Sequence, residues 1–75
     1  MTTFPQLKPR DLVKTLVANC GFVVVRQVGS HARLHGLHGE RVTIPMHNKP
    51  LAVGTLGSIL KQAGLNKDEL IKLLD

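Results

Sequence analysis

The sequence has few of the residues that several common kinds of site require. Its single cysteine, Cys20, cannot form a disulfide within the chain, and its place in an apolar helical stretch favours a structural role. Trp and Tyr are absent and only two Phe are present, which disfavours recognition of nucleic acid by base stacking. No apolar run approaches the ~20 residues of a membrane span, and the N-terminus lacks a signal-peptide pattern. We therefore expect a cytoplasmic protein with no membrane segment.

Acidic residues are also scarce. Five Asp and Glu oppose ten Lys and Arg, the formal net charge is +5, and between Leu12 and Asn66 the one acidic residue is Glu40. A small basic domain attracts acidic partners, and nucleic acid is the first candidate. Because a domain this short buries only ~60% of its unfolded surface, we expect one domain over residues 1–75 with an open site. Residues 1–7 are expected to form a loose lead.

The hydrophobic pattern predicts a two-layer α+β fold. Apolar residues at helical spacing, strands of alternating polarity, and Gly or Pro at the boundaries define six elements. In chain order these are a helix over Pro9–Cys20, strands over Phe22–Val28, His31–His35 and Arg41–Met46, a helix that Gly54 and Thr55 introduce and Gly64 ends, and a short helix opened by a capping box of Asn66 and Glu69. The strands should form a three-stranded antiparallel meander whose apolar face the helices cover.

Gly29, Ser30 and His31 lie between the first two predicted strands. Gly29 can adopt a positive φ and let the chain reverse, so that His31 becomes the first side chain of the second strand. Alternation then assigns a set of polar side chains to the sheet face away from the helices, namely His31, Arg33, His35, Arg41 and Thr43.

The four histidines do not have the spacing of a metal site. His31 and His35 share a strand face but lie roughly 13 Å apart along it, too far for one ion to bridge. His38 in a turn and His47 in a loop leave a mixed site open, although no Cys partner or carboxylate pair supports one. We predict neither a metal nor another cofactor.

His31 and Arg33 carry the groups that cleavage of RNA requires. RNA supplies its own nucleophile, the 2′-hydroxyl; a histidine can transfer the protons, and an arginine can stabilise negative charge at phosphorus. His47 or His35 could be a second proton carrier. Ser30 is a poor nucleophile here, because neighbouring side chains of an extended chain point apart and no acidic residue orients His31. On the residues alone, a His31 that only binds phosphate or caps a turn is the simpler interpretation.

Several short motifs, in order and spacing, resemble the HicA family of toxin–antitoxin toxins. They are Gly29-Ser30-His31, Arg41-Val42-Thr43-Ile44-Pro45 with His47 two residues beyond, Gly54-Thr55-Leu56, and the run Ser58-Ile59-Leu60-Lys61-Gln62-Ala63-Gly64-Leu65. The resemblance covers about Lys8 to Leu74. It implies a double-stranded-RNA-binding-like fold, and the predicted order of elements is that of such domains.

The resemblance also implies a function. HicA toxins are metal-independent mRNA endonucleases of type II toxin–antitoxin systems, and a HicB-type antitoxin covers their active surface. The catalytic histidine of the family maps onto His31. Candidate contacts to RNA are Arg33, His35, Arg41, Lys49 and Lys61, and His47 and Ser30 are candidate helpers.

Two departures from the family pattern affect binding more than catalysis. Leu34 stands where many members have an aromatic residue, and Gly57 stands where many have a basic one, which weakens the phosphate contact expected from the second helix. Two alternatives stay open: a degenerate relative that binds RNA or an antitoxin without cleaving, and a domain that binds only protein. Salt-sensitive affinity for RNA separates the first from the second.

Overall fold

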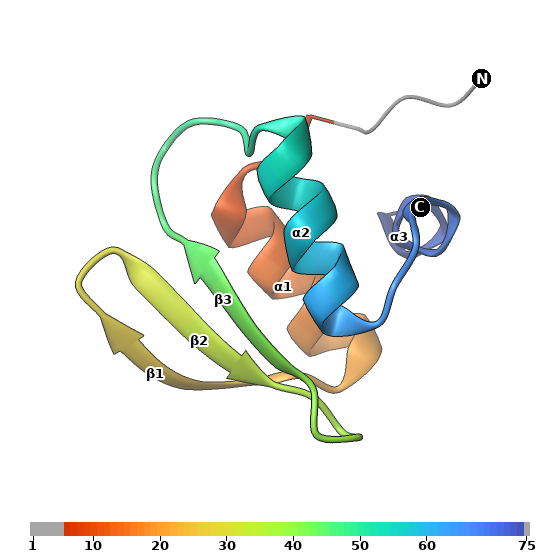
Figure 1. Ribbon diagram of the computed structural model, residues 1–75, viewed down its shortest axis with the longest axis horizontal. Coiled ribbons are helices and arrows are strands. Elements are labelled where there is room, and N and C mark those ends of the chain that lie inside the picture. The colour runs from red at the N-terminus through yellow and green to blue at the C-terminus, as the bar shows by residue number, and fades with distance from the viewer. Residues whose placement is uncertain (1–5, 75) are drawn as a thin grey trace.

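The chain folds into a three-stranded sheet with helices on one side. The computed structural model describes residues 6–74 (Figure 1). Its elements are α1 (Pro9–Cys20), β1 (Val23–Val28), β2 (His31–His35), β3 (Arg41–Pro45), α2 (Val53–Ala63) and α3 (Lys67–Leu74). The sheet is antiparallel with strand order β1-β2-β3, which confirms the predicted α+β fold and its short C-terminal helix.

The helix ends follow from local residues. α1 begins with Pro9, and at its end Gly21 adopts a φ of 72°, a conformation that favours glycine. α3 opens with the predicted capping box, because the Glu69 N–H donates to Asn66 Oδ1 at 2.8 Å and the Asn66 N–H donates to Glu69 Oε1 at 2.9 Å. α2 begins slightly earlier than predicted, since the Leu56 N–H already donates to the Ala52 carbonyl at 2.8 Å.

A two-residue turn joins β1 to β2. Val28 pairs with His31, and the turn between them consists of Gly29, with a φ of 58°, and Ser30. A positive φ at the first central residue alone is the pattern of a type II′ turn, whose twist matches that of the flanking strands. This turn makes His31 the first residue of β2, as the sequence predicted.

A β-bulge at Val25 sets which way β1 presents its side chains. Val24 pairs with Leu34 and Arg26 pairs with Arg33, so Val25 is an extra residue. In a regular strand Phe22 and Arg26 would share a face. With the bulge, Phe22 is directed into the core, where it is 4% exposed, while Arg26 lies opposite the exposed Arg33. The strand begins at Val23, one residue later than predicted, since the Phe22 N–H still donates to the Leu16 carbonyl of α1 at 3.2 Å.

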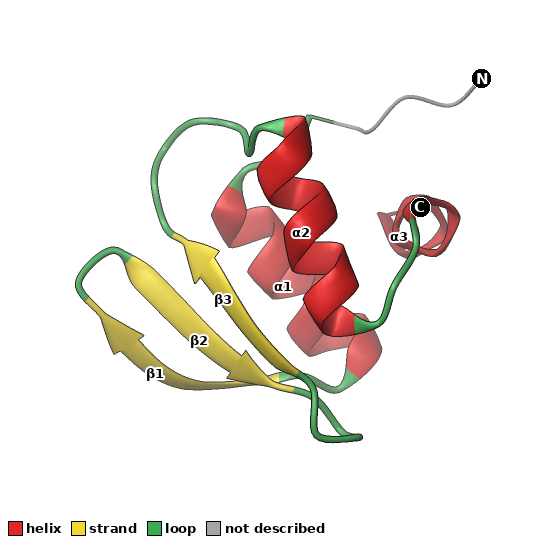
Figure 2. Ribbon diagram, viewed as in Figure 1, coloured by secondary structure: helices red, strands yellow, loops and turns green. Residues whose placement is uncertain are grey.

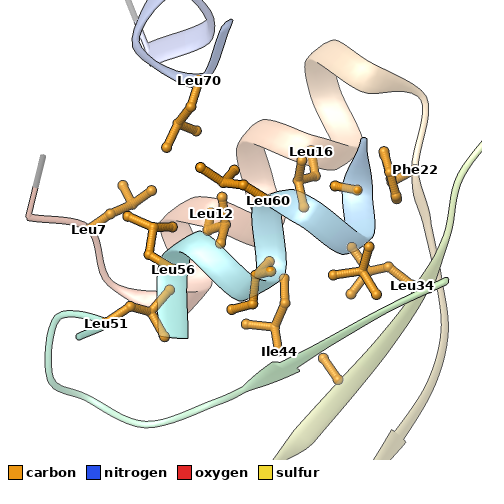
Figure 3. Close-up of a cluster of buried hydrophobic side chains, with 14 residues drawn as sticks. Leu7, Leu12, Leu16, Phe22, Leu34, Ile44, Leu51, Leu56, Leu60 and Leu70 are labelled. Carbon is orange, nitrogen blue, oxygen red and sulfur yellow. The ribbon is translucent and has the colours of Figure 1, made fainter. Parts of the chain in front are cut away.

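The core lies between the helices and one face of β2 and β3. Figure 3 shows Leu34 and Ile44 of the sheet beside the helical side chains of this cluster. Its buried members are Leu7, Leu12, Leu16, Phe22, Ala32, Leu34, Val42, Ile44, Leu51, Leu56, Ile59, Leu60, Ala63 and Leu70. On the opposite face of β2 and β3, side chains are exposed or half-buried, so the helices cover only one face.

Three side chains differ from the expected pattern. The predicted loose lead falls mostly on residues 1–5, outside the described residues, but Leu7 is buried and its carbonyl accepts the Leu51 N–H at 2.8 Å. Val17 is one of the apolar residues at helical spacing in α1 but is 43% exposed, because it lies about 100° around the helix from Leu16. Met46 follows the end of β3 instead of belonging to it, although it still packs against the core.

The two edges of the sheet are unlike each other. On the β3 edge, the Thr43 N–H donates to Oε1 of Gln62 in α2 at 3.1 Å, and Pro45 has no N–H. β1 is the strand farthest from α2 (Figure 2), and all six of its residues are exposed. Among residues 6–74, no helix is both long and apolar enough to cross a membrane.

Candidate nucleic-acid interface

The uncovered face of the sheet gathers most of the predicted site residues. Directly opposed residues of antiparallel strands share a face, so the register sorts its side chains into cross-strand rows. Beginning at the β1–β2 turn, the rows are Val28, His31 and Pro45; then Arg26, Arg33 and Thr43; then Val23, His35 and Arg41. We call this surface the open face. Between residues 6 and 74 the structure encloses no pocket, and the open face is where the polar side chains of the sheet collect.

His31 lies at the first row of the open face, next to the turn. Its side chain is exposed, with Val28 on one side and Pro45 on the other. Arg33 follows two residues along β2, a step of about 7 Å. His31 therefore presents a titratable ring to solvent beside apolar neighbours, with a guanidinium in the next row.

Ser30, His47 and Lys49 lie at the same end of the sheet as His31. The Met46 N–H donates to the Ser30 carbonyl, so the pairing of β2 with β3 continues past His31. His47 comes next and is exposed, and its Nδ1 accepts the Lys49 N–H at 3.3 Å. In the neutral ring Nδ1 is then the acceptor and Nε2 carries the proton.

His35 and Arg41 lie at the far end of the open face. They pair with each other, and β2 separates His35 from His31 by roughly 13 Å. One reacting phosphate cannot contact both histidines at this separation. Of the two candidates for a second proton carrier, His47 thus lies in a segment at the same end of the sheet as His31, whereas His35 lies at the other end.

Lys61 is not brought to the open face. It lies in α2, whose buried side chains pack against the opposite face of the sheet, and it is exposed. Its neighbour Gln62 reaches the β3 edge through the bond to Thr43. A ligand that contacts both Lys61 and His31 therefore has to pass around this edge.

Arg26 is a basic residue of the open face that the sequence pattern did not predict as a site residue. It is exposed and lies directly opposite Arg33. Counting alternate positions from the apolar Phe22 assigns Arg26 to the helix-covered face, and only the bulge at Val25 reverses this. Alternation counted back along β1 from the Gly29-Ser30 turn assigns Arg26 to the open face, because the pairing is regular from Val28 to Arg26.

The acidic residues that the structure describes lie outside the strands. They are Asp11 in α1, Asp68 and Glu69 in α3, and Glu40 in the β2–β3 turn, at the opposite end of β2 from His31. The backbone N–H groups of Glu40 itself and of His38 hold the pKa of the Glu40 carboxyl below its usual range. Its carboxylate binds this turn, with Oε1 accepting the His38 N–H at 2.9 Å. The charge of the open face is thus uniformly positive.

Cys20 has a structural environment. It is half-buried and packs against the core at the end of α1. Burial, and to a smaller extent the charge of Glu69, raise the pKa of its thiol, which lowers the fraction present as the reactive thiolate. Among the described residues, no group of three or more His, Cys, Asp and Glu side chains is placed to hold a metal ion.

We predict that Cys20 is alkylated more slowly than free cysteine at pH 8. The raised pKa leaves less thiolate at this pH, so the rate should still be rising above pH 9. Iodoacetamide labelling followed by mass measurement gives the rate, and the chain unfolded in urea is the control. A folded chain that reacts as fast as the unfolded chain would contradict the prediction.

The fold and the open face define a small α+β domain that presents a basic sheet surface around an exposed histidine. The model of the family described as the HicA toxin of bacterial toxin–antitoxin systems matches residues 9–65, and the chain belongs to this family. No curated protein matches the chain. The matched range begins with α1 and includes the open face, His47 and Lys61. The chain is therefore a toxin of a toxin–antitoxin system, and the resemblance noted in the sequence is confirmed.

Proposed function

We propose that this toxin is a metal-independent mRNA endonuclease in which His31 acts as general acid or base. The observation that supports the proposal best is the position of His31 on the open face, exposed and one row from Arg33. A histidine in this position can reach a phosphodiester that lies across the sheet. Transfer of a proton by such a group contributes ~10²–10⁴-fold to a rate.

The proposed reaction needs only groups that the chain and RNA provide. A base removes the proton of the 2′-hydroxyl, the 2′-oxygen bonds to phosphorus, and the bond from phosphorus to the 5′-oxygen breaks. An acid then protonates the leaving 5′-oxygen. His31 performs one of these transfers, and His47 is the candidate for the other, since its segment lies at the same end of the sheet.

The basic residues would hold the RNA. Arg33 is the nearest to His31 along β2 and would stabilise the charge that develops on phosphorus. More distant phosphates would meet four further candidates, which are His35, Arg41, Lys49 and Lys61. Ser30, next to His31 in the β1–β2 turn, is a candidate helper of His31. The partners would be mRNA and, as an inhibitor covering this surface, a HicB-type antitoxin, both in the cytoplasm.

Cleavage in the presence of EDTA tests the proposal. The purified chain should cut a single-stranded RNA of defined sequence at micromolar concentration with excess EDTA, and leave fragments with a 5′-hydroxyl. The matched control is the same oligonucleotide with 2′-deoxyribose at the cut position, which should survive because it lacks the nucleophile. Intact RNA under these conditions, or equal cleavage of the two oligonucleotides, would overturn the proposal and favour a module that only binds RNA.

A further inference from the structure

Two arginines oppose each other in the middle row of the open face. Arg26 on β1 pairs directly with Arg33 on β2, and directly opposed residues have Cβ atoms about 4.5–5.5 Å apart. Like charges in this position destabilise a sheet. Neither side chain is buried, so water reduces the repulsion without removing it.

Nothing in the described chain neutralises this pair. The side chains of Arg26 and Arg33 have no hydrogen-bond or ion-pair partner among residues 6–74, and β1, β2 and β3 contain no acidic residue. The third residue of their row, Thr43, is uncharged and could add a hydroxyl donor. The row is therefore a set of hydrogen-bond donors with two positive charges and no anion.

We propose that Arg26 and Arg33 together bind one phosphodiester group of the RNA, and that Arg26 is a substrate-binding residue of this toxin. Guanidinium groups bind phosphate oxygens through paired hydrogen bonds, and two of them side by side can hold both non-bridging oxygens. The pair lies one row, or about 7 Å, from His31, so a phosphate bound there is within reach of the histidine. That this phosphate is the one that is cleaved rests on the proposed function. That the two arginines bind a phosphate does not.

The bulge at Val25 gives Arg26 this position. Without the extra residue, Arg26 would lie on the same face of the sheet as the core residue Phe22. The bulge therefore lets Phe22, directly before β1, place its ring in the core while Arg26 of β1 adds a guanidinium to the open face.

Binding to an oligonucleotide that cannot be cut tests the pair apart from catalysis. The probe is a fully 2′-deoxy single strand, and affinity is measured by fluorescence anisotropy from 50 to 200 mM salt. Arg26→Gln should weaken binding several-fold and reduce the slope of log K against log salt by about 0.7, the value for one phosphate contact. Arg26→Lys should keep most of the slope and lose affinity, because lysine keeps the charge but not the paired donors.

Arg10→Gln is the matched control. Arg10 is an exposed arginine of α1, in the helical layer, and its replacement removes the same charge away from the open face. Arg10→Gln should retain the wild-type slope. Equal losses in the two variants would show a general charge effect and overturn the proposal, as would wild-type affinity in Arg26→Gln.

A second measurement concerns stability. In low salt, Arg26→Gln should have an unfolding temperature equal to or above that of the wild type, because it removes the repulsion with Arg33. Inorganic phosphate should raise the unfolding temperature of the wild type more than that of Arg26→Gln. Equal gains would overturn the proposal. A chain that binds the deoxy strand through Arg26 but leaves RNA intact would overturn the proposed cleavage. It would still support phosphate binding by the arginine pair.

Discussion

Replacing His31 with glutamine is expected to reduce the rate of RNA cleavage by ~10²–10⁴-fold. Glutamine keeps a polar side chain of similar reach but cannot exchange a proton at neutral pH. The change should leave the fold intact, since the His31 side chain is exposed and its backbone pairing with Val28 and Pro45 does not depend on the ring. The measurement is the first-order rate of cleavage of a defined RNA in EDTA, together with thermal unfolding of each protein.

His38→Gln is the control for this prediction. His38 is exposed in the β2–β3 turn, and it is the backbone N–H, not the ring, that binds Glu40. This variant should cleave at the wild-type rate. Induced in bacteria, wild type and His38→Gln should arrest growth, whereas His31→Gln should permit it. Cleavage by a folded His31→Gln protein at the wild-type rate would show that another group performs the chemistry.

Leu34→Ala is expected to destabilise the fold by about 2–5 kcal/mol. Leu34 is 0% exposed at the centre of the covered face of β2, where it pairs with Val24 and Val42. Its truncation removes apolar contacts and leaves a cavity beneath the helices. A domain of this length has only ~4–11 kcal/mol of stability in total, so the loss is a large fraction of it and the variant should unfold at a clearly lower temperature than the wild type.

Urea unfolding followed by circular dichroism measures this loss. Val23→Ala is the control, because Val23 is 59% exposed at the start of β1, and its truncation should change the free energy of unfolding by less than ~0.5 kcal/mol. Equal changes in the two variants would mean that the sheet is not packed as Figure 3 shows.

Local signals account for the parts of the fold that the sequence predicted well. Pro9 and Gly21 mark the two ends of α1 through restrictions on the backbone, and such restrictions act whatever packs nearby. The capping box of Asn66 and Glu69 is equally local. The same holds for His31, because the turn before it fixes both its strand and its face.

Features set by distant contacts were not predictable in this way. The Leu7 carbonyl is bound by the N–H of Leu51, which lies far along the chain, and no sequence pattern near Leu7 predicts that contact. The bulge at Val25 depends on how β1 pairs with β2, so alternation along β1 does not place Arg26 on the open face. The separation of Lys61 from the open face follows from the packing of α2, which periodicity alone does not give.

The bare edge of β1 has a consequence for handling the free protein. A strand whose outer backbone groups are unpaired, with four exposed valines, is a template for aggregation, and at this edge the net charge of +5 is what keeps copies apart. Salt screens that charge. Concentrated stocks of the toxin should therefore aggregate less in low-salt buffer than in high-salt buffer.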